Sequence, residues 1–170
     1  VLGAASTHEA RAIVDDAVAS DTYDGFNLVV AERGGPSTPG DPTALYFEWD
    51  GDLRVRRLDP GIHVVVNVGI DGEYFEPDRD PDRGAEQAGN ATRLRDALIP
   101  DSGESVSRWR SRAADALGNH DYGVCVHEPD RGFGTRSSSL FTLFADGTGD
   151  VKFADGSPCQ TAFRRVEGQV

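Results

Sequence analysis

Three short stretches of the chain carry side chains that could bind or act on a ligand. The first runs from Asp59 to Asn67 and contains His63. The apolar run from Ile62 to Val68 predicts a buried strand, on which residues four apart point to the same face. A buried amide must be hydrogen-bonded, so Asn67 either pins a turn or presents its NH2 group to a ligand. The residues alone favour the structural role.

The second stretch, Gly132 to Ser139, combines glycines, hydroxyl side chains and an arginine just before a predicted strand. The hydroxyls of Thr135 and Ser137, with the guanidinium of Arg136, suit a cradle for an anion or a carboxylate. Loops rich in Gly and Ser are also common as plain turns, and the Gly-Lys-Ser/Thr ending of a P-loop is absent. Both interpretations stay open.

The third stretch holds His120, Asp121 and His127, which suggest metal binding or acid–base chemistry. No third ligand lies at useful spacing along the sequence, so exposed or strand-edge histidines are the simpler interpretation. Cys125 and Cys159 are the only cysteines, and neither belongs to a CxxC pair. The sequence therefore predicts no metal site and no cofactor, with Cys125 as a small buried apolar residue.

Known catalytic and ion-binding signatures are missing from the rest of the chain. Asp78 to Gly84 alternates aspartates as a calcium loop does, but Pro81 interrupts it and the later Gly and Glu are absent. There is no Gly-x-Ser-x-Gly elbow and no Ser/His/Asp order. Spacing alone therefore specifies no reaction.

Hydrophobic periodicity, caps and turn residues predict the elements that must position these stretches. Helices are expected over Thr7–Ala19 (capped by Ser6 or Thr7), Gln87–Leu98 and Ser105–Leu117. Strands are expected over Phe26–Ala31, Ala44–Trp49, Leu53–Leu58, Ile62–Val68, Gly123–His127, Ser138–Phe144, Asp150–Phe153 and around Ala162–Val166. Runs of strands separated by a helical pair predict an α+β fold, with helices packed on antiparallel sheets in a single domain over residues 1–170.

The charge of the chain limits its partners. Its formal net charge is -12, from 29 acidic and 17 basic residues, and Lys152 is the only lysine. The acids are dispersed, which favours a surface adapted to high salt, as in halophilic organisms. A nucleic acid partner is not expected, because phosphate binding needs basic patches. We expect a cytoplasmic protein without membrane association, since there is no signal peptide and no apolar run of about 20 residues.

Three segments together resemble successive landmarks of the NRDE family, which includes the transport and Golgi organisation protein 2 group. They are Tyr23–Leu28, Leu58–Asn67 and Gly132–Leu140, and the turn at Asp146 with Phe153 fits the same pattern. The acidic, lysine-poor composition is similar to that of haloarchaeal members. The resemblance implies an αββα sandwich of two antiparallel sheets, as in N-terminal nucleophile hydrolases.

The same resemblance implies amide-bond hydrolysis, on C–N bonds of a small non-peptide substrate. The family's N-terminal cysteine and Asn-Arg-Asp-Glu motif are absent here, and the chain has no methionine. We therefore expect the nucleophile on a missing N-terminal segment of the same protein, and a fold incomplete at that end. Asn67 and Arg136 match the residues that polarise the scissile carbonyl and steady the nucleophile.

Two alternatives stay open beside the hydrolase. One is a non-catalytic carrier of haem or another small ligand, with His63, His127 and Cys125 as the candidate haem ligands. The other is a scaffold for the missing N-terminal segment. In that case the isolated chain is expected to associate through an exposed sheet edge.

Overall fold

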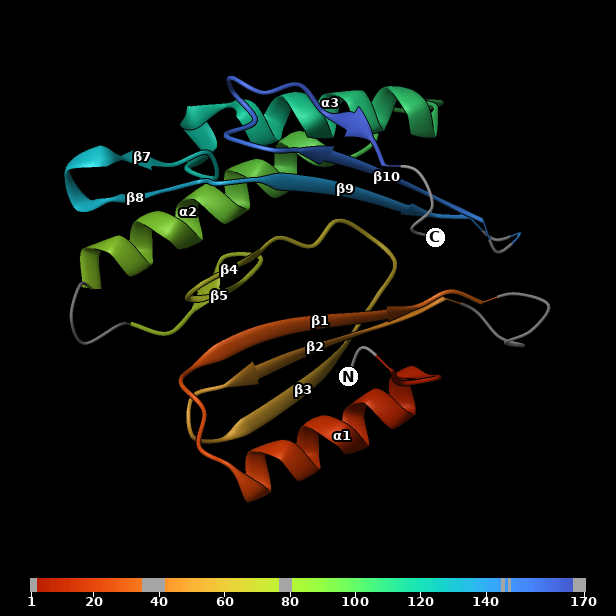
Figure 1. Ribbon diagram of the computed structural model, residues 1–170, viewed down its shortest axis with the longest axis vertical. Helices are drawn as coiled ribbons and strands as arrows, with labels where there is room; N and C mark the ends of the chain where they lie inside the picture. Colours follow the sequence, from red (N-terminus) through yellow and green to blue (C-terminus); the bar gives the residue numbers. More distant parts are fainter. Residues whose placement is uncertain (1–2, 35–41, 77–80, 145, 147, 167–170) are drawn as a thin grey trace. The chain divides into compact units, whose positions relative to one another are not determined.

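The computed structural model describes residues 3–34, 42–76, 81–144, 146 and 148–166 of the chain (Figure 1). The chain divides into two compact units. Unit 1 is Val1–Gly61 with Ala145–Gly147, and unit 2 is Ile62–Phe144 with Thr148–Val170. Both units combine helices with antiparallel strands, which confirms the predicted α+β class.

Unit 1 is one helix on a three-stranded antiparallel sheet. Its elements are α1 (Thr7–Ser20), β1 (Phe26–Glu32), β2 (Thr43–Trp49) and β3 (Leu53–Leu58), and the sheet order is β1-β2-β3. The helix and the three strands are those the sequence predicts. Of the loop expected over Arg33–Pro42, residues 35–41 lie outside the described part of the chain.

The helix α1 is fixed to this sheet at its start and along one face. The Ser6 hydroxyl caps it by accepting a hydrogen bond from the Glu9 NH group. The Glu32 carboxylate, at the end of β1, accepts from the backbone NH and the hydroxyl of Thr7, at 2.9 and 3.1 Å. Apolar side chains of α1 and β2 are buried, among them Ala10, Val14 and Phe47. Burial of one helical stripe on the sheet follows from the predicted periodicity.

The described residues of unit 2 form two long helices, two 3₁₀ turns and three small antiparallel sheets. Its elements are β4 (Val65–Val66), β5 (Gly69–Ile70), β6 (Glu73–Tyr74), α2 (Pro81–Leu98), α3 (Val106–Gly118), η1 (His120–Tyr122), β7 (His127–Glu128), η2 (Pro129–Arg131), β8 (Phe133–Gly134), β9 (Ser138–Leu143), β10 (Gly149–Ala154) and β11 (Arg164–Arg165). The sheet orders are β4-β5-β6, β7-β8 and β11-β10-β9.

The prediction of one strand over Ile62–Val68 is wrong. The chain turns at Asn67 and pairs β4 with β5 in a short hairpin. The carboxylate of Asp71 bends it further, because its two oxygens bind the Val64 NH group and the His63 ring, both at 2.7 Å. His63 lies outside any strand, so the argument that placed His63 and Asn67 on one strand face fails.

Two other predicted boundaries shift. Helix α2 begins at Pro81, not at Gln87, and proline is tolerated in a first turn because its missing NH group needs no partner there. Of the predicted polar loop at Asp78–Gly84, residues 78–80 lie outside the described part and the remainder is helical. The strand expected over Gly123–His127 is reduced to β7.

The helices α2 and α3 form the core of unit 2. Ala91 and Leu94 of α2 pack with Ala116 of α3 and with Val64. The last turn of α2 exposes carbonyl groups that no helical NH group satisfies. The Trp109 indole donates to the Leu98 carbonyl at 2.6 Å, so α3 caps α2.

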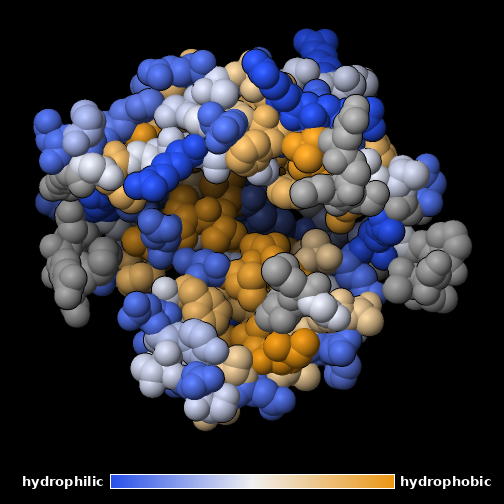
Figure 2. Space-filling model, viewed as in Figure 1, coloured by the Kyte–Doolittle hydropathy of each residue, from blue (hydrophilic) through white to orange (hydrophobic). Residues whose placement is uncertain are grey.

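Hydrophilic side chains cover much of the face drawn in Figure 2, and apolar ones gather in patches. Apolar side chains on the outer face of β9 are part of the exposed surface, with Phe141 71% and Leu143 49% exposed. Among the described residues, no helix has both the length and the apolar character needed to cross a membrane.

Candidate metal centre

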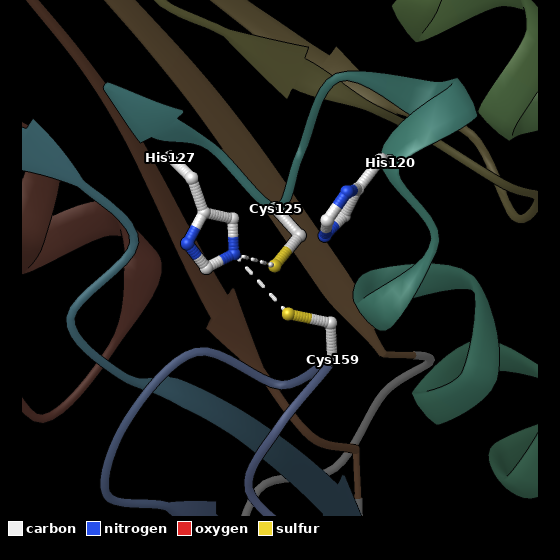
Figure 3. Close-up of side chains that lie close together, drawn as sticks. All are labelled: His120, Cys125, His127 and Cys159. Atoms are coloured by element: carbon white, nitrogen blue, oxygen red, sulfur yellow. Dashed lines mark hydrogen bonds between the residues drawn. The ribbon is translucent and has the colours of Figure 1, made fainter. Parts of the chain in front are cut away.

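Four side chains of unit 2 converge at one point, as Figure 3 shows: His120, Cys125, His127 and Cys159. Each offers one ligand atom, and these atoms all lie within 4.8 Å of one another. They come from η1, from the segment before β7, from β7 itself and from the loop after β10. The fold thus joins two imidazoles and two thiols from distant parts of the sequence.

A tight turn places the first three of these side chains. The Asn119 side chain caps η1 by accepting from the Asp121 NH group at 2.9 Å. Gly123 then takes a left-handed conformation with φ 64°, and a β-carbon there would lie 2.1 Å from the Asn90 amide nitrogen. Glycine is favoured at this turn, since any other residue would be strained and would displace the Asn90 side chain, and the turn brings the following segment back beside His120.

Thr135 holds together the two segments that carry the sulfur atoms. Its hydroxyl accepts from the Val126 NH group at 3.0 Å and donates to the Val124 carbonyl at 3.2 Å. Its carbonyl accepts from the Ser157 hydroxyl at 2.8 Å. The Ser157 carbonyl in turn accepts two backbone NH groups that close the loop around Cys159. Thr135 therefore positions both cysteines without being a ligand itself.

The distances within the cluster suit tetrahedral coordination. The His127 Nε2 atom lies 3.5 Å from the Cys125 sulfur and 3.2 Å from the Cys159 sulfur. The ring centroids of His120 and His127 are 5.1 Å apart. Zinc bonds of about 2.3 Å to sulfur and about 2.0 Å to nitrogen hold tetrahedral donors about 3.5 Å apart. Little movement is needed for the four atoms to share one ion.

The protonation of the thiols governs what the cluster can bind. Desolvation raises the pKa of the Cys159 thiol, and the neighbouring Cys125 raises it further. A thiol binds metal only as the thiolate, so binding must release its proton, and affinity rises with pH. Cys125 is buried, whereas the two histidines and Cys159 are exposed. An ion can therefore reach the cluster from solvent.

A cavity of about 660 Å³ borders the cluster within unit 2. Cys125 and His127 belong to its lining, with Asn67 at the β4–β5 turn. Its polar lining also includes Arg83 of α2 and Glu128 of β7, whose side chains form an ion pair at 3.1 Å. A small polar molecule in this cavity would lie against two of the four candidate ligands.

The residues predicted from the sequence are only partly brought together. Asn67 lines the same cavity as Cys125 and His127. Thr135 holds the segment around Cys125 through its hydrogen bond with Val126. His63 is held by Asp71 in its own turn. Arg136 and Ser137 are exposed, and the described residues that line the cavities of unit 2 include neither of them. The predicted cradle therefore contributes Thr135 alone to this site.

Sequence spacing did not reveal the four-residue cluster. The neighbours of His120 and His127 in the sequence offer no third ligand at useful spacing. Cys159 follows His127 only after β8, β9 and β10, so its approach depends on the tertiary fold. One available signal was that both cysteines and two of the four histidines fall in the same 40-residue stretch.

Comparison with known proteins identified no relative of this chain. No protein-family model matches the chain, and no curated protein or solved structure is significantly similar to it. The assignment of function therefore depends on the geometry of the site.

Proposed function

We propose that unit 2 is a metal-binding domain that holds one Zn²⁺ ion through His120, Cys125, His127 and Cys159. The observation that supports this is the convergence of two sulfur and two nitrogen donors within 4.8 Å of one another. Four protein ligands fill a tetrahedral zinc ion, which is typical of structural rather than catalytic sites. The ion would fasten the loop after β10 to β7 and η1.

The donor set favours zinc over the other common ions. Thiolate and imidazole ligands suit zinc and related soft or borderline metals, whereas calcium and magnesium require oxygen ligands. The ligand order, His-x4-Cys-x-His followed by a distant cysteine, differs from the paired spacing of zinc fingers. The site would depend on the whole of unit 2 rather than on a short motif.

The test is a titration of the reduced, metal-free chain with Co²⁺, which reports coordination through its absorption spectrum. We expect one equivalent to give the intense visible bands of tetrahedral cobalt together with thiolate-to-cobalt charge transfer. Added Zn²⁺ should then bleach both features. Weak octahedral bands, or no saturation near one equivalent, would overturn the proposal.

Matched histidine variants separate this site from adventitious binding. His120→Ala removes an exposed ligand of the cluster, and His8→Ala removes an exposed histidine of α1 in unit 1. We expect His120→Ala to weaken cobalt binding at least tenfold and His8→Ala to leave it unchanged. Cys159→Ser should remove about half of the charge-transfer intensity, because Cys125 remains as the second thiolate. Equal effects of the two histidine variants would contradict the assignment.

A second candidate is the amide hydrolase of the N-terminal nucleophile type, with its sandwich of two antiparallel sheets. It is supported by Asn67, whose side chain borders the cavity of about 660 Å³. The nucleophile would come from a segment upstream of Val1, and Asn67 would donate to the carbonyl of a small amide. The test compares the hydrolysis of small anilides by the upstream-extended protein and by its Asn67→Ala variant. Unchanged turnover in Asn67→Ala would exclude this role.

A further inference from the structure

A second cavity of unit 2, of about 490 Å³, lies between α3, β9, β10 and the loop that leads to β11. Arg110 of α3 and Lys152 of β10 both line it. Lys152 is the only lysine of a chain whose net charge is -12. The only lysine of this acidic chain and an arginine therefore line the same cavity. Two basic side chains at one cavity are unexpected in a chain of this charge.

Positive charges are concentrated around this cavity. Asp150 forms an ion pair with Arg110 and a second one with Arg165, at 2.9 Å. Lys152 lies directly opposite Arg165 in the register of β10 and β11. Like charges at opposed positions destabilise a sheet, and here Arg110, Arg165 and Lys152 outnumber the nearby carboxylates of Asp150 and Asp115. A bound anion would relieve this repulsion.

Arg110 also has an unused donor. Its Nε–H group is buried and lacks a hydrogen-bond partner, while its terminal nitrogen is held by Asp150. Buried donors are almost always paired with an acceptor, from protein, water or ligand. Because the Nε atom is closed to solvent, an anionic oxygen in the cavity can supply this acceptor only if the Arg110 side chain shifts, whereas the positive charge of Arg110 acts on the cavity without any shift.

The remaining lining limits the kind of anion. Leu140 and Phe163 give the cavity an apolar side, and Ser111 and Thr161 add hydroxyl groups. Asp115 also lines it, which disfavours a ligand with several negative charges. We infer that this cavity binds a small organic monoanion, a carboxylate held between Arg110 and Lys152 with its apolar part against Leu140 and Phe163. The cavity shares Cys159 with the metal centre, so butyrate is titrated into the reduced, metal-free chain, where the inference can be tested whether or not zinc binds.

The first test compares butyrate with butyramide, which has the same size and shape but no charge. Both are titrated into the ¹⁵N-labelled chain at constant ionic strength and followed by amide chemical shifts. We expect saturable shifts with butyrate at Lys152 and Phe163, and binding of butyramide that is weaker by at least tenfold. Equal binding of the two compounds, or no saturable shift with butyrate, would overturn the inference.

The second test uses variants with the same change of net charge. Lys152→Gln removes a cation from the cavity wall, whereas Arg11→Gln removes an exposed one that is paired with Asp15 on α1 of unit 1. We expect butyrate affinity to fall about tenfold in Lys152→Gln and less than twofold in Arg11→Gln. Lys152→Arg should restore most of the affinity. Equal losses in the two glutamine variants would show general electrostatic attraction and no site.

Inorganic phosphate provides a third comparison, because it offers charge without an apolar part. We expect phosphate to bind more weakly than butyrate, since Asp115 opposes its second charge and Leu140 and Phe163 gain no contact. Tighter binding of phosphate would contradict the carboxylate assignment.

Discussion

Thr135 shows how one side chain outside the cluster can fix its geometry. Its hydroxyl bridges the Val124 carbonyl and the Val126 NH group, on either side of Cys125. The loop that carries Cys159 is bound to the Thr135 carbonyl through Ser157. The relative position of the two sulfur atoms thus depends on Thr135, which is not itself a candidate metal ligand.

We therefore expect Thr135→Val to weaken zinc binding by up to about thirtyfold, because valine keeps the shape of threonine but loses two hydrogen bonds of about 1 kcal/mol each. Competition with a colorimetric chelator measures the affinity. The cobalt spectrum should keep its tetrahedral form, since all four ligands remain.

Two controls define this positioning role. Thr135→Ser keeps the hydroxyl and should bind zinc nearly as the wild type does. Thr142→Val makes the same substitution on β9, away from the cluster, and should have no effect on affinity. Unchanged affinity in Thr135→Val would show that the hydroxyl does not set the geometry of the site.

The guanidinium group of Arg112 stabilises the junction between the helices α2 and α3. The Arg112 guanidinium of α3 donates to the Ile99 carbonyl at 3.0 Å and to the Ala97 carbonyl, near the end of α2. Its orientation is fixed by Glu104, which accepts from it at 3.1 and 2.6 Å through both carboxylate oxygens. A carboxylate that binds a guanidinium through both of its oxygens fixes the orientation of the guanidinium in addition to stabilising it.

This pair makes the junction sensitive to acid. The hydrogen bond from Arg112 holds the pKa of Glu104 below its ordinary value of 4.5. A carboxylate with a lowered folded-state pKa stabilises the fold above its ordinary pKa and loses that contribution as pH falls through the folded value. We expect Glu104→Gln to lower the melting temperature by a few degrees at pH 7. The gap should close as the pH falls below about 4.5.

Thermal melts from pH 7 down to pH 3 measure this effect. Asp155→Asn neutralises an exposed acid of unit 2 and serves as the control, with a pH profile parallel to that of the wild type. A gap between Glu104→Gln and wild type that stays constant below pH 4 would contradict the role of the ion pair.

Elements with strong local signals could be predicted from the sequence, and those set by tertiary contacts could not. The caps at Ser6 and Ser105 predict the starts of α1 and α3, and the Asp50-Gly51 turn predicts the β2–β3 hairpin. The apolar run at Ile62–Val68 failed because Asp71 captures the Val64 NH group that a longer strand would have used. Periodicity contains no information about such a competing acceptor.

The same reasoning explains what the sequence revealed of the site. His120 and His127 suggest metal binding or acid–base chemistry by their residue type, and Thr135 is one of the hydroxyls of the Gly- and Ser-rich loop. Their connection through Cys159 stayed hidden, since three strands separate that residue from β7. The cation cluster around Asp150 was equally invisible, because it depends on the register of β10 and β11.

For the molecule as a whole, the clustered positive charges and the candidate binding sites are unevenly distributed between the two units. The net charge of -12 is spread along the sequence, yet in unit 2 Asp150 forms ion pairs with Arg110 and Arg165 and also feels the charge of Lys152. All four candidate metal ligands and both cavities also belong to unit 2. Unit 1, by contrast, is a helix packed on a hairpin-linked sheet whose own core is buried.

Zinc should therefore slow amide hydrogen exchange in unit 2 and leave unit 1 unchanged. An ion that binds only the closed form stabilises it by mass action, and at about one hundred times its dissociation constant it suppresses opening about a hundredfold. The effect should be confined to residues 120–128 and 157–161, whose opening separates the ligands. Exchange measured by mass spectrometry, with and without zinc, resolves these peptides from those of residues 26–58. Cys159→Ser should abolish the protection. If the strands of unit 1 gained as much protection as the loop around Cys159, zinc would be acting on the chain as a whole. It would then not be fastening the loop after β10 to β7 and η1.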